Sequence, residues 1–249
     1  MKYKSLFISD LHIGLEKSKV KEFLSFFKDN EFDNIFLVGD IFDIWKLESK
    51  WYWESSYNYF ILNILEAVGQ GANVYFAYGN HEDIFDSLIS KTKEDCIDFK
   101  GILIKREFTY TTKTKEGREQ KILVVHGDKY DSLNKITKYL RRWVFLTEFK
   151  TVRYLLGLFN EIAHELEKKI LKWENKKKTF KGKLEEQAKL KKCNAIVCGH
   201  IHTPEIYRIG SILYMNCGDY LDKETCIVED YEGNFLLLDK GGVQKSVCL

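Results

Sequence analysis

Proline is nearly missing from this chain of 249 residues, which contains only one, and its six cysteines include no Cys-x-x-Cys pair. So little proline argues against disordered linkers between separate units. Several cysteines fall within apparent strands, which indicates reduced thiols packed in a core, as is usual in a cytosolic protein. Together these features disfavour a secreted protein held together by disulfides.

Long apolar runs are also missing. No stretch approaches the roughly 20 apolar residues that a membrane-spanning helix needs, and the start of the chain carries no leader with an apolar core and a cleavage site. We therefore expect a cytoplasmic protein. Peripheral contact with the inner face of the membrane stays open as an addition to that expectation.

Apolar residues nevertheless make up 45% of the chain, enough for the core of one α/β domain with an insertion. Helical spacing predicts one helix face at Val20, Phe23, Leu24 and Phe27. A second face, at Phe60, Ile61, Ile64, Leu65 and Val68, would end at Gly69 or Gly71. Residues 102–126 predict two strands around a turn at 115–118, and residues 205–239 a meander of strands.

Five of the six histidines lie in short polar motifs, and each motif directly follows an apolar run. The five motifs are Asp10-Leu11-His12, Gly39-Asp40-Ile41-Phe42-Asp43, Gly79-Asn80-His81-Glu82, His126-Gly127-Asp128 and Gly199-His200-Ile201-His202. The runs are rich in β-branched and aromatic residues, which is typical of strands buried on both faces. Because ligands bind at the carboxyl ends of strands in open α/β sheets, five strands of one sheet would bring these motifs together.

Carboxylate, imidazole and amide groups gathered at one place indicate a site for two divalent metal ions. Asn80 would supply a neutral oxygen, which limits the charge of the site. If the turns are extended, residues two apart, such as Asp10 and His12, point the same way and can face one cluster. The remaining histidine, His164, lies in a charged helical run and is expected to be exposed.

Each motif alone is weak, but in this order they resemble the signature of the calcineurin-like metallophosphoesterases over roughly positions 4–128 and 194–239. The resemblance implies the α/β (α+β) class: a four-layer αββα sandwich, with residues 1–249 as a single domain. It implies a first metal held by Asp10, His12 and His202, and a second held by Asn80, His126 and His200. Asp40 would bridge both ions.

The resemblance also implies the chemistry. Water held between two metals loses a proton near neutral pH, and the resulting metal-bridging hydroxide can attack phosphorus. His81 and Asp43 are the catalytic candidates: His81 would protonate or stabilise the leaving oxygen, and Asp43 would orient a ligand. Glu82 or Asp83 would orient the His81 ring. The alternatives are a structural histidine at a turn and a carboxylate that caps the next helix.

Imidazole and carboxylate ligands suit manganese, iron or zinc, and the family favours manganese. Within the superfamily the chain is most similar to the branch of UDP-2,3-diacylglucosamine diphosphatase, which splits a lipid-linked UDP sugar in lipid A synthesis. The shared features are an aromatic-basic segment at residues 44–53, Asp131 after His-Gly-Asp, and a long helical insertion. The best-known members carry Arg at the position of His81 and often a basic residue at that of Thr203. The chain therefore resembles the wider branch, whose substrates are poorly defined.

The insertion, residues 129–192, carries 18 lysines and arginines against 8 acidic residues, although the net charge of the whole chain is +2. Such segregation indicates an anionic partner. It is either an ordinary helical subdomain or a lid that takes up acyl chains and pairs arginines with a diphosphate. The candidate substrate-binding residues there are Arg141, Arg142 and Trp143. Trp45, Trp51 and Trp53 either contact substrate or only pack a long loop.

Two other functions are alternatives to the hydrolysis of a lipid-linked nucleotide sugar. A phosphodiesterase acting on nucleotides or nucleic acid would also account for basic residues interleaved with aromatic ones. A non-catalytic scaffold predicts lost ligands, whereas every ligand position of this chain is filled. Both enzymatic hypotheses predict a substrate that contains phosphate.

Overall fold

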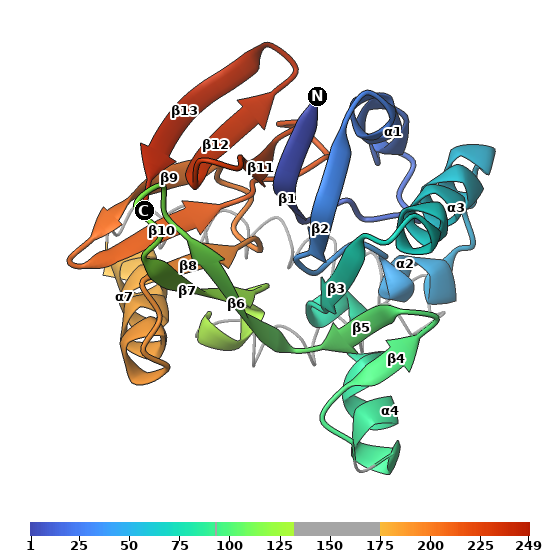
Figure 1. The fold of residues 1–249 in the computed structure, drawn as a ribbon. Coiled ribbons are helices and arrows are strands. Elements are labelled where there is room, and N and C mark those ends of the chain that lie inside the picture. Colours follow the sequence, from blue (N-terminus) through green and yellow to red (C-terminus); the bar gives the residue numbers. More distant parts are fainter. Residues whose placement is uncertain (93, 132–174) are drawn as a thin grey trace.

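The computed structural model describes residues 1–92, 94–131 and 175–249, and within these residues the strands form two sheets (Figure 1). The larger sheet consists, in spatial order, of β13 (Gly242–Cys248), β12 (Asn234–Asp239), β11 (Cys226–Glu229), β1 (Lys2–Ile8), β2 (Glu31–Leu37), β3 (Asn73–Ala77), β5 (Ile102–Lys105) and β4 (Ile97–Phe99). The smaller sheet consists of β6 (Glu107–Lys113), β7 (Glu119–Val125), β8 (Ala195–Cys198), β10 (Ile212–Asn216) and β9 (Glu205–Ile209).

Helices lie outside the sheets. They are α1 (Val20–Lys28), α2 (Ile44–Ser49), α3 (Ser55–Gly69), α4 (Ile84–Thr92) and α7 (Asn175–Leu190), with short 3₁₀ turns η1 (Asn80–Glu82) and η2 (Asp128–Tyr130). Among the described residues, none of these helices has the length and apolar character needed to cross a bilayer.

Alternation along β1 shows why the larger sheet is covered on both faces. Leu6 and Ile8 point to the face of the sheet that carries the helices, where they share a core with Phe23 of α1 and Phe60 of α3. Phe7 points to the opposite face of the sheet. Successive side chains of a strand point to opposite faces, so an uninterrupted apolar run requires a cover on each side. The predicted face of α1 is confirmed, since its four residues are all buried. Of the predicted face of α3, Phe60 and Ile64 are buried and the other three residues are half-buried, and the helix ends at Gly69.

A second core fills the space between the two sheets. The rings of Phe7 and Phe36 stack with centroids 4.7 Å apart, and Ile122 and Val124 of β7 share this core. The third core lies on the far face of the smaller sheet, where Leu123 of β7 packs with α7. Three cores between four layers confirm the predicted αββα sandwich (Figure 1).

The prediction that the five motif strands belong to one sheet is wrong. β1, β2 and β3 are parallel neighbours in the larger sheet, whereas β7 and β8 are parallel neighbours in the smaller one. Similarly, the predicted meander divides between the sheets: β9 and β10 pair in one, β11 and β12 in the other. Buried strands of the two sheets are alike in composition. The apolar runs in the sequence therefore do not indicate to which sheet each strand belongs.

The second half of the predicted insertion contributes to the sandwich itself. α7 places Phe180, Leu184 and Ala188 against the smaller sheet, and the chain then re-enters that sheet as β8, directly beside β7. The rest of the predicted insertion, residues 132–174, lies outside the described residues.

Phe36→Ala is expected to destabilise the protein by about 3–5 kcal/mol, because it opens a cavity between the two sheets. Phe36 is 1% exposed and stacks on both Phe7 and Tyr75. Urea unfolding measures the change. The matched control is Leu62→Ala on α3, where the side chain is 57% exposed and the change should stay within about 0.5 kcal/mol. Similar losses in the two variants would contradict the layered core.

Candidate metal centre

The loops that follow the five motif strands meet at one rim of the sandwich. Main-chain hydrogen bonds tie them together: Asp10 N donates to Gly39 O, and Gly199 N to His126 O, both at 3.0 Å. In addition, Asp10 Oδ2 accepts from His200 N at 3.0 Å. The last contact links the two sheets, since Asp10 follows β1 and His200 follows β8.

The backbone of these loops is strained rather than extended. Asp10, His12, His200 and His202 have φ values of 54°, 48°, 69° and 48°, and Asp40 has 51°. Among the described residues, only three other non-glycine residues have positive φ. Residues outside glycine rarely adopt this conformation, and clusters of it mark functional sites. The expectation that extended turns align residues two apart is therefore wrong, because the side chains converge through left-handed backbone instead.

Two groups of potential ligands lie side by side. Ligand atoms of Asp10, His12 and His202 all fall within 4.8 Å of one another, as do those of Asp40, His126 and His200. These are the carboxylates and imidazoles predicted for the first and second ion, with Asp40 as the bridging residue.

Asp40 connects the groups. Its Oδ2 lies 3.2 Å from His126 Nε2, 3.8 Å from His81 Nε2 and 4.0 Å from His12 Nε2. Burial alone would raise the pKa of Asp40, yet the imidazoles of His126 and His81 hold it well below its usual range. A carboxylate that stays ionised among several ring nitrogens has the charge required of a shared metal ligand.

Unsatisfied polar atoms show that the residues fit metal ions. Among the described residues, the buried side-chain atoms without a hydrogen-bond partner include Asp10 Oδ1, His12 Nε2, Asn80 Oδ1 and His126 Nε2. Buried polar groups are normally paired, so four such atoms at one place require an explanation. Each is a ligand atom suited to a divalent cation. Asn80 is 7% exposed and directly precedes His81, whose backbone N–H donates to Asp40 Oδ1.

Carboxylates and carbonyls behind the rings orient them. His126 Nδ1 donates to Val38 O at 2.9 Å, which leaves Nε2 for the cluster. Asp131 Oδ2 lies 3.4 Å from His200 Nε2, and Asp219 Oδ2 lies 3.7 Å from His202 Nδ1. The sequence interpretation missed Asp219. Its signal was a Gly-Asp pair just after the apolar run of β10, the same pattern as in the other motifs.

Asp43 does two things at once. Its Oδ2 lies 3.2 Å from His12 Nδ1, and its Oδ1 both accepts from Lys46 N at 2.9 Å and lies 3.1 Å from His81 Nδ1. The capping alternative for Asp43 is therefore confirmed, and its contact with His12 is the one that the orienting alternative requires. The cluster of His12, Asp43 and His81 is thus an orienting arrangement that uses the Nδ1 atoms of both rings, on the side away from Asp40.

Glu82 has a role that was not foreseen. It is fully buried, Oε2 accepts from Asp40 N at 2.9 Å and Gly79 N at 2.8 Å, and Oε1 accepts from Phe42 N at 2.8 Å. Of the two residues predicted as alternatives to orient the His81 ring, Glu82 does not do so, because both of its oxygens accept from backbone N–H groups. Burial and the neighbouring Asp40 raise the pKa of Glu82 to about 7. Glu82 joins the loops after β2 and β3.

Other predicted residues fall as follows. Burial raises the pKa of the Cys198 thiol to about 12, so this residue is a packed thiol rather than a thiolate ligand, as expected. Trp45 is buried, whereas Trp51 is 70% exposed. His164 and the candidate substrate residues Arg141, Arg142 and Trp143 lie outside the described residues.

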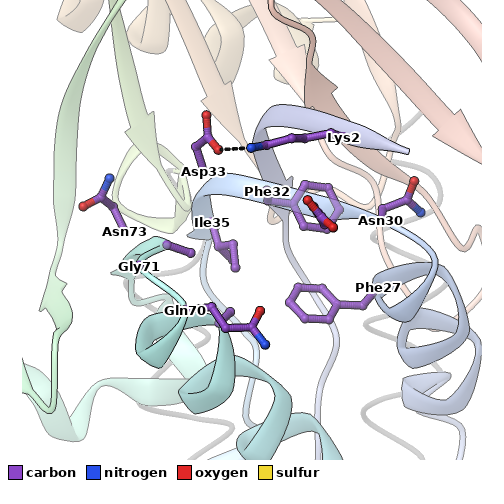
Figure 2. Close-up of a pocket in the computed structure, with 12 residues that line it drawn as sticks. Lys2, Phe27, Asn30, Phe32, Asp33, Ile35, Gln70, Gly71 and Asn73 are labelled. Atoms are coloured by element: carbon purple, nitrogen blue, oxygen red, sulfur yellow. Dashed lines mark ion pairs between the residues drawn. The ribbon is translucent and has the colours of Figure 1, made fainter.

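A separate cavity of about 280 Å³ opens at the opposite end of β1, β2 and β3 (Figure 2). Lys2 and Asp33 form an ion pair of 3.5 Å at its edge, and Phe27 and Phe32 line it. The residues around it include no histidine or cysteine. This cavity lacks the ligand chemistry of the cluster, so the candidate site is the rim where the motif loops meet.

Comparison with known proteins agrees with this geometry. A family model described as calcineurin-like phosphoesterase matches residues 3–204. The chain belongs to this family, and it is accordingly a metal-dependent phosphoesterase.

Individual relatives have low sequence identity to this chain. The UDP-2,3-diacylglucosamine hydrolase of Shewanella sp. (strain W3-18-1) is 25% identical over 224 residues, which cover 83% of this chain and 84% of the relative. That of Shewanella sp. (strain ANA-3) is 22% identical over 248 residues, covering 92% and 95%. Among solved structures, the phosphoesterase Yfce from E. coli has a TM-score of 0.50 at 13% identity, covering 98% of each chain, and this likeness concerns the fold alone.

Gly79→Ala is expected to abolish metal loading and lower phosphodiesterase activity about 100-fold. Gly79 has φ of −97°, so its backbone suits any residue, but a Cβ there would overlap Asp40 Oδ1 and lie 2.7 Å from His126 Cδ2. Gly69→Ala is the matched control, because a Cβ at that position meets nothing within 4 Å. Metal content by plasma mass spectrometry and activity on bis(p-nitrophenyl) phosphate are the measurements. Normal metal content in Gly79→Ala would show that the packing around Asp40 is not required.

Proposed function

We propose that this protein hydrolyses a phosphodiester or pyrophosphate bond with the help of two divalent metal ions. We propose manganese as the metal. Asp10, His12 and His202 hold one ion, Asn80, His126 and His200 hold the other, and Asp40 bridges them. The observation that carries this proposal is the position of Asp40 Oδ2, which faces imidazoles of both groups.

The chain supplies the remaining catalytic groups. When bound, the ions would polarise the phosphoryl oxygens and activate water for an in-line displacement. His81 Nε2 lies 3.8 Å from Asp40 Oδ2, at the edge of the cluster. From there it can donate a proton to the leaving oxygen. Asp43 holds the Nδ1 edges of both His81 and His12, so it fixes the proton donor relative to the metal ligands.

For the substrate we propose UDP-2,3-diacylglucosamine or a closely related lipid-linked nucleotide sugar. Support comes from relatives that bear this name and match 83–92% of the chain at 22–25% identity. A diacylated substrate lies in a membrane, so we propose a cytoplasmic enzyme with peripheral contact at the inner face.

We also propose that residues 129–192 form a helical insertion within one metallophosphoesterase domain, whose last helix, α7, packs onto the smaller sheet. Support comes from the parallel pairing of β7 with β8 on either side of it. The excess of basic residues in this segment favours an anionic substrate. Arg141, Arg142 and Trp143 stay predictions as its substrate contacts.

The same basic excess also favours a second candidate, a phosphodiesterase that acts on nucleotides or single-stranded nucleic acid. The two candidates differ in salt dependence. Binding to a phosphate polymer weakens steeply with added salt, whereas hydrolysis of a lipid-linked sugar depends on how the acyl chains are presented in detergent.

Asp40→Asn is expected to lower turnover by at least about 100-fold, because a neutral amide weakens the bridge shared by both ions. Calorimetric titration of manganese into metal-stripped protein should show that the affinity of both sites falls. Asp95→Asn, which alters an exposed carboxyl outside the cluster, serves as the control and should behave as the parent protein. Near-normal turnover in fully loaded Asp40→Asn would rule out the bridged site.

A hydrolysis panel with added manganese tests the substrate. We expect UDP-2,3-diacylglucosamine to give UMP and an acylated sugar phosphate at a rate well above those for cyclic nucleotides, short single-stranded DNA and simple diesters. Phosphorus NMR and mass spectrometry identify the products. Preferential cleavage of DNA or cyclic nucleotides, lost as salt is raised, would favour the second candidate instead.

A further inference from the structure

Three contacts hold the imidazole of His81 in one orientation. The indole of Trp45 stacks on it, with ring centroids 4.3 Å apart and planes inclined at 31°. Asp43 Oδ1 lies 3.1 Å from Nδ1, and the ring of His12 lies nearly perpendicular to the imidazole, with centroids 4.7 Å apart. Protein groups therefore occupy one face and one edge of the ring.

Trp45 is itself held firmly. It is 7% exposed, and its indole N–H donates to Asp83 Oδ1 at 3.3 Å. It lies in the first turn of α2, the helix that Asp43 caps by accepting from Lys46 N. Because one carboxylate caps the helix that carries the indole and also contacts the imidazole, all three groups keep their relative positions.

The free edge of the ring points to the cluster. His81 Nε2 lies 3.8 Å from Asp40 Oδ2, and the side chain as a whole is 21% exposed. A proton donor acts only when it stays within hydrogen-bond reach of the leaving oxygen.

We propose that Trp45 is a positioning residue for the reaction, an inference that rests on the proposed role of His81 as proton donor. The indole prevents the imidazole from turning away, so Nε2 stays directed at the side of the cluster where Asp40 lies. Asp43 restrains the Nδ1 edge. Trp45 does not touch the reacting atoms.

The test compares two phosphodiesters that differ in leaving group. Nitrophenolate departs with little help from an acid, whereas phenolate needs protonation of its oxygen. Trp45→Leu should therefore lower kcat for diphenyl phosphate about tenfold more than kcat for bis(p-nitrophenyl) phosphate. Trp45→Phe, which restores an aromatic face, should recover most of this difference. Metal content and thermal unfolding confirm that each variant is loaded and folded, and Trp45→Met replaces the leucine variant if that one does not fold.

Two further variants make the outcome decisive. Trp53→Leu is the matched control: this indole stacks on Trp51 at 5.5 Å, and its loss should affect both esters equally. His81→Ala should show the selective loss in full. If His81→Ala shows this selective loss while Trp45→Leu lowers kcat for both esters equally, the positioning role of Trp45 is wrong and the proposed function stands. If His81→Ala itself lowers both equally, the proposed role of His81 as proton donor is wrong.

Discussion

The site depends on one buried carboxylate, that of Asp40, at only 3% exposure. An ionised carboxyl is costly to bury unless opposite charges and hydrogen bonds compensate. Here Oδ2 faces ring nitrogens, Oδ1 accepts from His81 N, and the backbone N–H of the same residue is held by Glu82. Gly79 leaves room beside it because a Cβ would overlap Oδ1. The surrounding loops are thus arranged around this one group.

Two acidic residues support Asp40 in different ways. Glu82 binds only backbone N–H groups and keeps the loops after β2 and β3 together. Asp43 contacts rings, and it links His12, a proposed metal ligand, to His81, the proposed proton donor. The left-handed backbone at five ligand positions costs free energy. Both sheets contribute to the site, because Asp10 and Asp40 follow strands of the larger sheet, whereas His126 and His200 follow strands of the smaller one.

Much of this arrangement could be predicted. The donor residues, their order and their place after buried strands follow from local patterns, and the burial of Val20, Phe23, Leu24 and Phe27 follows from helical spacing. Other features escaped local reasoning. An apolar run such as that before His126 reveals burial on two faces but not the sheet to which it belongs. Likewise, the sequence around Glu82 does not reveal that its oxygens meet N–H groups of a loop some 40 residues away.

The sequence by itself determined which chemical groups are present and that each stands at the end of a buried strand, because composition and periodicity are local properties. Only the tertiary structure decided how these groups meet. The partition of the motif strands between two sheets, the left-handed turns at the ligands, and the contacts of Asp219 and Trp45 with histidines all arise from packing between segments distant along the chain. Such contacts are set by the register and layering of the whole sandwich, which no short window of residues contains.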